Sequence, residues 1–199
     1  MDDKTDDKSQ KSYWFTLLQT EFAKESDRAS VILAVAMLDQ ALESLLRCHL
    51  VAIPNSDDSM LDGAYAPIST FSARIDLSFR LGLISSRFSR DLHIVRRIRN
   101  EFAHNVTGCS FEDSSARNRV SELLRTSRVV EMHQKYRHLY AEGTRGDFQT
   151  VVSWLLWALW YKHDDAKPLA EHSPEFGYEV NNPPTTTLPS DAANGAPLR

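Results

Sequence analysis

Apolar residues recur every three or four positions along most of the chain, and no segment shows the alternation of apolar and polar residues that is typical of a strand. The strongest stripe lies in residues 27–50, where neither Gly nor Pro interrupts the spacing of Val31, Val35, Leu38 and Leu42. Because residues spaced in this way share one face of a helix, this segment is predicted to be the central core helix. Weaker stripes predict further helices over 13–24, 71–82, 86–104, 116–124, 132–143 and 148–163. The pattern predicts an all-α fold, a single helical bundle of about six to seven helices.

The two ends of the chain differ in composition from the middle. Residues 1–12 carry four Asp and three Lys without a hydrophobic period, and residues 164–199 hold six of the eight Pro among Thr, Asn, Ser and acidic residues. Such segments cannot bury enough apolar surface to offset the entropy that ordering them would cost. The sequence therefore predicts one helical domain over 13–163, with disordered tails over 1–12 and 164–199.

The formal net charge of −4 is unevenly distributed along the chain. The tails account for the acidic excess, since residues 13–163 carry 18 basic and 17 acidic side chains. From Arg87 to Arg128 there are nine Arg against five acidic residues, which favours a modest basic patch. Arg-rich helix faces of this kind are also commonly just solvated.

Several functional classes lack their signatures in this sequence. Cys48 and Cys109 are neither in a CxxC pair nor near spaced His ligands, which argues against a disulfide framework and a zinc site. There is no GxGxxG, Walker loop or GxSxG elbow. No apolar signal core follows the first charged residues, so the sequence predicts a cytoplasmic protein without a cofactor.

The last predicted helix, 148–163, is apolar almost all round, and Asp147 is predicted to cap it. Its apolar part is too short to cross a membrane, which would need roughly 20 residues. The helix is therefore predicted to be core or a subunit interface. Trp154, Trp157 and Trp160 offer large contact areas of the kind that dominate interfaces, although such clusters are also common inside a single chain. A homodimer is predicted on this basis.

The segment 91–105, DLHIVRRIRNEFAHN, combines an amphipathic helix with an unusual polar cluster. At about 100° per residue, one face of this helix consists of Ile94, Val95, Ile98 and Phe102. Arg99 lies at the border of that face, whereas Asn100 and His104 lie roughly opposite it. Because Arg99 and His104 point about 140° apart, a single straight helix cannot aim both at one small target.

Asn105 is a natural helix terminator, so His104 is predicted to lie in the last turn. Unpaired carbonyls and the helix dipole there favour a protonated imidazole, which suits proton donation or phosphate contact. The other interpretation is an exposed helix end whose polar side chains are merely solvated. Asp39 and Arg96 are candidate supporting residues, since Asp39 on the central helix could orient Arg99 if the two helices pack together.

The run RIRNEFAH resembles the motif of the HEPN superfamily, in which an Arg, a polar residue directly after it and a His a few positions later lie on one helix. Here those residues are Arg99, Asn100 and His104. The longer stretch from Met60 to His104 resembles more specifically the MltR family, named for the mannitol operon repressor. The ordered series that carries this resemblance is Pro67, Phe71, Arg74, Ile75, Leu81, Gly82, Leu83 and Ile84, followed by the motif.

The MltR resemblance implies an all-helical regulatory protein that acts on transcription through a protein partner, such as a transcription factor, without a DNA-reading module of its own. Under this hypothesis the motif helix is architectural. Arg99 and His104 would fasten neighbouring helices or a dimer partner, and Asn100 would satisfy backbone groups. We favour this hypothesis because the MltR resemblance extends over a longer stretch of the chain than the HEPN-like motif.

The HEPN resemblance implies the alternative, a metal-independent endoribonuclease of the toxin or defence type. Its catalytic candidates are Arg99, Asn100 and His104, its substrate would be RNA, and a nucleotidyltransferase-like antitoxin would be its protein partner. Cleavage through the 2′-hydroxyl needs a base, an acid and a cation for the phosphate charge. One copy supplies one His of this motif, so a twofold dimer would have to bring two motif helices together.

The two helices around LGLIS, followed by an Arg-rich helix, also imitate a helix-turn-helix DNA reader. The supposed recognition helix would have to use the same residues as the HEPN-like motif. The nearly neutral body also lacks the strong positive field of a DNA-binding protein, which argues against direct sequence-specific DNA binding.

Overall fold

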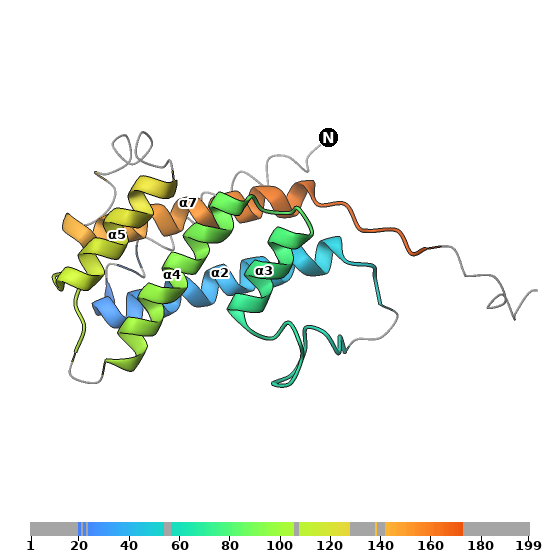
Figure 1. Cartoon of the computed structure of the whole chain (residues 1–199), viewed down its shortest axis with the longest axis horizontal. Helices are drawn as coiled ribbons and strands as arrows, with labels where there is room; N and C mark the ends of the chain where they lie inside the picture. The colour runs from blue at the N-terminus through green and yellow to red at the C-terminus, as the bar shows by residue number, and fades with distance from the viewer. Residues whose placement is uncertain are drawn as a thin grey trace, which may run out of the picture. The chain divides into compact units, whose positions relative to one another are not determined.

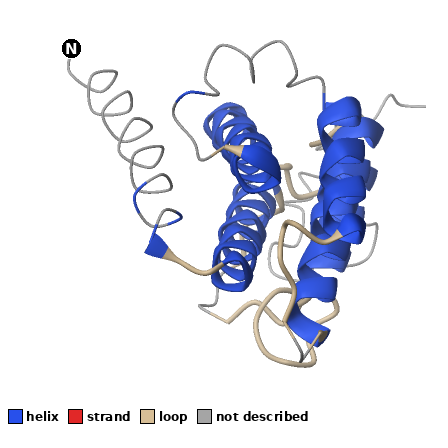
Figure 2. Ribbon diagram, turned by 90° about the vertical axis from the view of Figure 1, so that its left-hand side faces the viewer, coloured by secondary structure: helices blue, strands red, loops and turns tan. Residues whose placement is uncertain are grey.

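The computed structural model describes residues 24–53, 57–105, 108–127 and 142–172, together with residues 20, 22 and 138. Within this part there are five α-helices and no strand, which confirms the predicted all-α class (Figures 1 and 2). The helices are α2 (Asp27–His49), α3 (Phe71–Arg80), α4 (Ser86–His104), α5 (Ser114–Ser127) and α7 (Gly143–Asp165).

Two of the predicted helices, over 13–24 and 132–143, lie almost wholly outside the described residues, which accounts for the lower helix count. The predicted tail 1–12 and most of the predicted tail 164–199 also lie outside them. All five described helices belong to one compact unit, Met1–Leu169.

Helix α2 is the centre of the core, as its apolar stripe predicts. It packs against α3, α4 and α7. Val31, Leu38, Leu42 and Leu45 are completely buried in the same cluster as the apolar face of α4. By length and composition alone α2 could cross a membrane, but half of its most apolar window is buried within the protein. The packing of α2 against three other helices makes it a core helix of this bundle.

Three helices begin where the sequence places a hydroxyl cap. Ser26, Thr70 and Ser85 each accept a hydrogen bond at 3.2 Å from the backbone N–H three residues later, at the starts of α2, α3 and α4. These bonds satisfy one of the backbone donors that every helix start leaves unpaired. The caps therefore fix where α3 and α4 enter the bundle.

The loop between α4 and α5 is anchored in the core by an aromatic side chain. Phe111 is 1% exposed and lies between Phe102 of α4 and Phe148 of α7, with ring centroids 5.0 and 5.3 Å away. Its backbone N–H donates to Asp27 Oδ2 over 3.1 Å. The loop thus joins the start of α2 to the centre of the aromatic cluster.

The prediction that Asp147 caps the last helix is wrong. Helix α7 begins at Gly143, with Glu142 in the cap position and no side-chain cap bond. Arg145 in its first turn donates to Asp27 Oδ1 over 3.1 Å and to the carbonyl of Glu25 over 2.6 Å. These contacts hold the first turn of α7, which lies before the predicted helix start, against the start of α2. Because they join distant segments, no local sequence pattern predicts them.

Candidate functional site

The motif helix α4 borders a cleft of about 530 Å³, called here the α4 cleft. Helices α2, α3 and α4 pack against one another in pairs (Figure 1), and residues of all three helices line the cleft. Its lining consists of Ile32, Val35, Ala36 and Asp39 of α2, Ser69 to Ser72 at the start of α3, and Arg96, Arg99 and Asn100 of α4. The structure thus brings together four of the sequence-derived candidates, Asp39, Arg96, Arg99 and Asn100.

Helix α4 positions these residues because its opposite face is apolar. Ile94, Val95, Ile98 and Phe102 are buried in the core, as the helical spacing predicts. Burying that face turns the polar side outward and places Arg96 and Asn100 at the edge of the bundle. Arg97 and Arg99 are exposed.

Neither arginine of the α4 cleft is neutralised by a carboxylate in the described part of the chain. Arg99 Nη1 donates to Asn100 Oδ1 over 3.1 Å, so the first two motif residues are directly joined. Arg96 Nε is buried and has no hydrogen-bond acceptor there. A buried donor without an acceptor is costly, and such a group is commonly completed by water, an ion or a ligand.

Asp39 pairs with α3 rather than with Arg99. Arg74 Nη1 lies 2.7 Å from Asp39 Oδ1, and Arg74 Nη2 lies 2.8 Å from Glu43 Oε2. Arg74 is only 8% exposed, and its Nε also donates to the Ile68 carbonyl over 3.1 Å. This network fastens the start of α3 to α2, so it also holds one wall of the α4 cleft in place.

Glu43 of this network also binds Arg47. Glu43 and Arg47, four residues apart on α2, form an ion pair at 2.7 Å. The hydrogen bonds that Arg47 donates to the Glu43 carboxylate raise the pKa of Arg47 above its usual value. The pKa of the Asp62 carboxyl is lowered, mainly by the hydrogen bond that it accepts from the Asp58 backbone N–H. The hydrogen bond that it accepts from Arg47 is the second cause. The network therefore continues into the loop before α3.

His104 ends helix α4, as predicted, and it is exposed. It does not line the α4 cleft. Arg99 and His104 of one chain therefore face different surroundings, in agreement with the angle between them on a helix. Within a single chain, this arrangement gives Arg99 a binding cleft without an adjacent imidazole.

A second group of arginines lies at the junction of α4 and α5. Arg87, Arg90 and Arg125 line a hollow of about 550 Å³ together with Ser86 and Thr126. Arg90 is paired with Glu122 at 3.2 Å. Asp91, which accepts a hydrogen bond from Thr126, is buried behind it, and burial raises the pKa of its carboxyl. The basic stretch of the sequence is therefore partly neutralised in the fold.

Sequence reasoning missed two parts of the site. The sequence did not identify the start of α3 as part of the site, although Thr70, Phe71 and Ser72 form a wall of the α4 cleft. Arg74 was identified from the sequence only as one of the residues that carry the resemblance to the MltR family. Its position on the buried side of an amphipathic helix was a usable signal, since a buried Arg requires acidic or carbonyl partners.

Comparison with solved structures finds a related fold in a chain of the X-ray structure of the MtlR–HPr complex from Escherichia coli. The match has a TM-score of 0.54 and covers 74% of this chain and 98% of that chain, with 19% sequence identity. The fold is MtlR-like. The all-helical fold implied by the longer resemblance is thus confirmed, whereas the HEPN resemblance of the short motif gains no support. No protein-family model and no curated protein matches the sequence.

The described residues contain no group of three or more His, Cys, Asp or Glu side chains that could hold a metal ion. The Asp39 carboxylate in the α4 cleft is paired with Arg74, so the polar groups left there for a ligand are the two arginines, the Asn100 amide and hydroxyl groups. These groups bind and orient anions.

Proposed function

We propose that this chain is an MtlR-like regulatory protein, which acts on transcription by docking a partner protein on the exposed side of α4. The likeness to a chain of the MtlR–HPr complex supports a protein partner, because that fold is seen there in a complex with another protein. The match spans nearly all of that chain, so the whole helical body is available for an equivalent role here.

The observation that carries this proposal is the unpaired positive charge of α4. Arg96, Arg97 and Arg99 have no carboxylate partner in the described part of the chain, whereas Arg90 and Arg119 are paired with Glu122 and Glu101. Exposed charges of one sign steer a partner of opposite charge and fix its orientation. The partner should therefore present an acidic surface to this side of α4.

Direct reading of DNA is not part of the proposal. A DNA-binding helix needs several cations free to contact phosphates, supported by a positive field over the surrounding surface. Here Arg90 of α4 and Arg119 of α5 form ion pairs with acidic side chains, so they are not free to contact phosphates. The chain also carries a net charge of −4.

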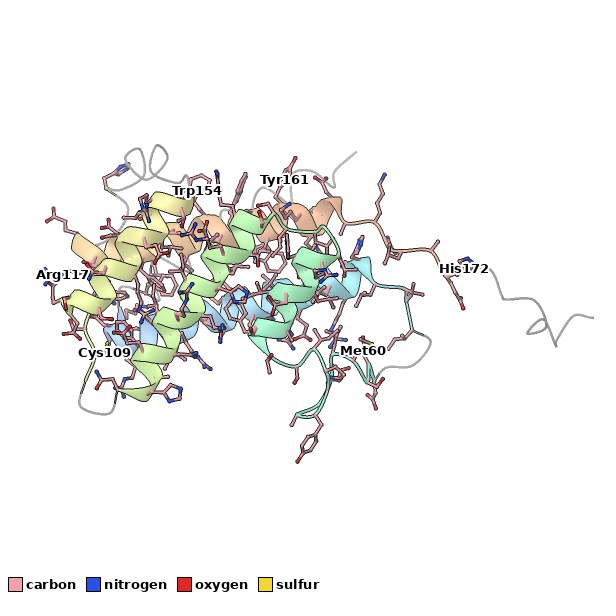
Figure 3. All side chains as sticks on the ribbon, viewed as in Figure 1. Met60, Cys109, Arg117, Trp154, Tyr161 and His172 are labelled. Atoms are coloured by element: carbon pink, nitrogen blue, oxygen red, sulfur yellow. The ribbon has the colours of Figure 1, made fainter. Side chains whose placement is uncertain are left out.

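Titration of the full chain with purified Escherichia coli HPr in a calorimeter tests partner docking. We expect saturable binding with a Kd of about micromolar order, as for transient regulatory complexes. Arg97→Glu should weaken the binding at least about tenfold by opposing the acidic partner surface. The matched control is Arg117→Glu on α5, an exposed arginine on another helix (Figure 3).

Two results would contradict this docking proposal. One is the absence of saturable binding at HPr concentrations up to about 1 mM, which corresponds to an affinity too weak for regulation. The other is an equal loss of affinity in the α4 and α5 variants, which would indicate general charge attraction instead of a docking surface.

The alternative, a dimeric endoribonuclease, would use the exposed His104 and Arg99 of two chains. A dimer has a candidate surface on α7, where Trp157 and Tyr161 are 43% and 53% exposed and their rings stack with centroids 5.8 Å apart. Trp154 and Tyr161 lie along the upper edge of α7 in Figure 3. Under this alternative, light scattering should give twice the chain mass of 22.6 kDa.

A cleavage assay separates the two functions. If the chain is a ribonuclease, it should cut labelled RNA in the presence of EDTA and leave a 2′,3′-cyclic phosphate or its hydrolysis product. His104→Gln should then slow cleavage by roughly 10² to 10⁴, because a general acid or base is lost while a polar side chain is kept. A wild type that cuts no RNA as monomer or dimer, or a folded His104→Gln dimer of full activity, removes this alternative.

A further inference from the structure

The α4 cleft offers more hydrogen-bond donors than the chain uses. Arg96 contributes a buried Nε that has no acceptor among the described residues. Arg99 contributes a guanidinium whose bond within the described part is to the neutral amide oxygen of Asn100. Two guanidinium groups beside one cavity form a site for a planar or tetrahedral oxyanion, because each fork can donate two parallel N–H bonds.

The start of α3 adds donors from the opposite wall of the same cleft. Of its first four backbone N–H groups, that of Ala73 donates to Thr70 Oγ1 and that of Arg74 donates to the Thr70 carbonyl. Those of Phe71 and Ser72 have no acceptor in the described part of the chain, and both residues line the cleft. The positive end of the helix dipole also favours an anion there.

The carboxylate in the cleft lining does not cancel this positive charge. Asp39 lies 2.7 Å from Arg74, a buried cation that is not part of the lining. Among the described residues, Arg96 and Arg99 are therefore left as two uncompensated charges. An anion with two negative charges would neutralise both.

Another part of the lining is apolar and offers a surface for an apolar part of the ligand. Ile32, Val35 and Phe71 face the same cavity, and Ile32 is 43% exposed although it is large and hydrophobic. A cleft of about 530 Å³ lies in the size range of small-molecule sites. The ligand should accordingly carry an apolar or ring-shaped group next to its charged end.

We propose that the α4 cleft binds a small organic phosphate, a phosphate monoester whose phosphoryl group lies between Arg96, Arg99 and the start of α3. Its three terminal oxygens and double charge match the donors on both walls, which a single carboxylate could not occupy together. Its organic body would lie on Ile32 and Val35. This site shares Arg96 and Arg99 with the proposed docking surface on α4, and it would give the regulatory protein a small-molecule effector.

Calorimetric titration of the full chain at low salt tests the ligand class with three probes. Phenyl phosphate carries both the phosphoryl group and an apolar ring, inorganic phosphate lacks the ring, and benzoate keeps the ring with a single carboxylate. We expect saturable binding of phenyl phosphate and at least about tenfold weaker binding of each of the other two, since each loses one set of contacts. Absence of saturable phenyl phosphate binding, or equal affinity for benzoate, would overturn the proposal.

Substitutions locate the site. Arg96→Gln and Arg99→Gln should each raise the Kd of phenyl phosphate at least about tenfold, because each removes a charge-assisted fork. The matched control Arg97→Gln, on the same helix but outside the cleft lining, should leave that Kd unchanged. An equal effect of all three variants would overturn the assignment to the cleft.

Folding and partner docking are separated from the effector site by the same variants. Arg99 is exposed, so its variant remains a valid test even if Arg96→Gln disturbs folding, which circular dichroism would report. Loss of HPr binding in Arg97→Glu with unchanged phenyl phosphate binding would support two separate sites. A chain that binds phenyl phosphate at the cleft but not HPr would keep this inference and reject the docking proposal.

Discussion

Replacing Phe111 by Ala is expected to lower the free energy of unfolding by about 3–5 kcal/mol, the largest effect of a single substitution in this account. Phe111 is 1% exposed and contacts the rings of Phe102 and Phe148. Its removal would leave a cavity where α4, α7 and the loop before α5 meet. Denaturant unfolding followed by circular dichroism measures the change.

The control is Phe79→Ala, which removes the same side chain from a position on α3 that is 41% exposed. Because removing a partly exposed ring leaves no internal cavity and loses little buried apolar surface, the free energy of unfolding should fall by about 1 kcal/mol or less. Equal losses at Phe111 and Phe79 would show that the aromatic cluster does not hold the loop in the core.

Replacing Arg74 by Met is expected to cost about 2–4 kcal/mol of stability, because Asp39 and Glu43 would lose a cation from a largely buried site. The Ile68 carbonyl would also lose its donor. Arg74→Lys should be intermediate, since it keeps the charge but not the fork that reaches two carboxylates and a carbonyl. Thermal and denaturant unfolding of both variants measure these differences.

Arg80→Met provides the matched control on the same helix. Arg80 is exposed and lies in the last turn of α3, so its removal should change stability by roughly 0.5 kcal/mol or less. If Arg74→Met is as stable as this control, the Arg74 network does not fasten α3 to α2, and the α4 cleft must be held open by other contacts.

Local features of this fold could be predicted from the sequence. The apolar spacing of α4 identified its buried face, and a hydroxyl residue stands at three of the helix starts, Ser26, Thr70 and Ser85. These features depend on neighbours within one helix turn, so a single stretch of sequence contains them. The same spacing indicated that Arg99 and His104 cannot share one target in a single chain.

Features that depend on contacts between distant segments were not predictable in this way. Phe111 lies in a polar loop, and its burial depends on α4 and α7. The early start of α7 depends on Arg145 contacting Asp27, more than a hundred positions away. The partner of Asp39 proved to be Arg74, because the packing of α3 on α2 decides which cation reaches that carboxylate.

The claim that α4 is the docking surface is tested most directly by chemical-shift mapping of the ¹⁵N-labelled chain during titration with unlabelled HPr. We expect the backbone amides of residues 96–104 to shift progressively and to saturate, while those of 114–127 on α5 remain unchanged. Shifts confined to α5 or α7, or no shift at an HPr excess that should saturate the site, would contradict the account.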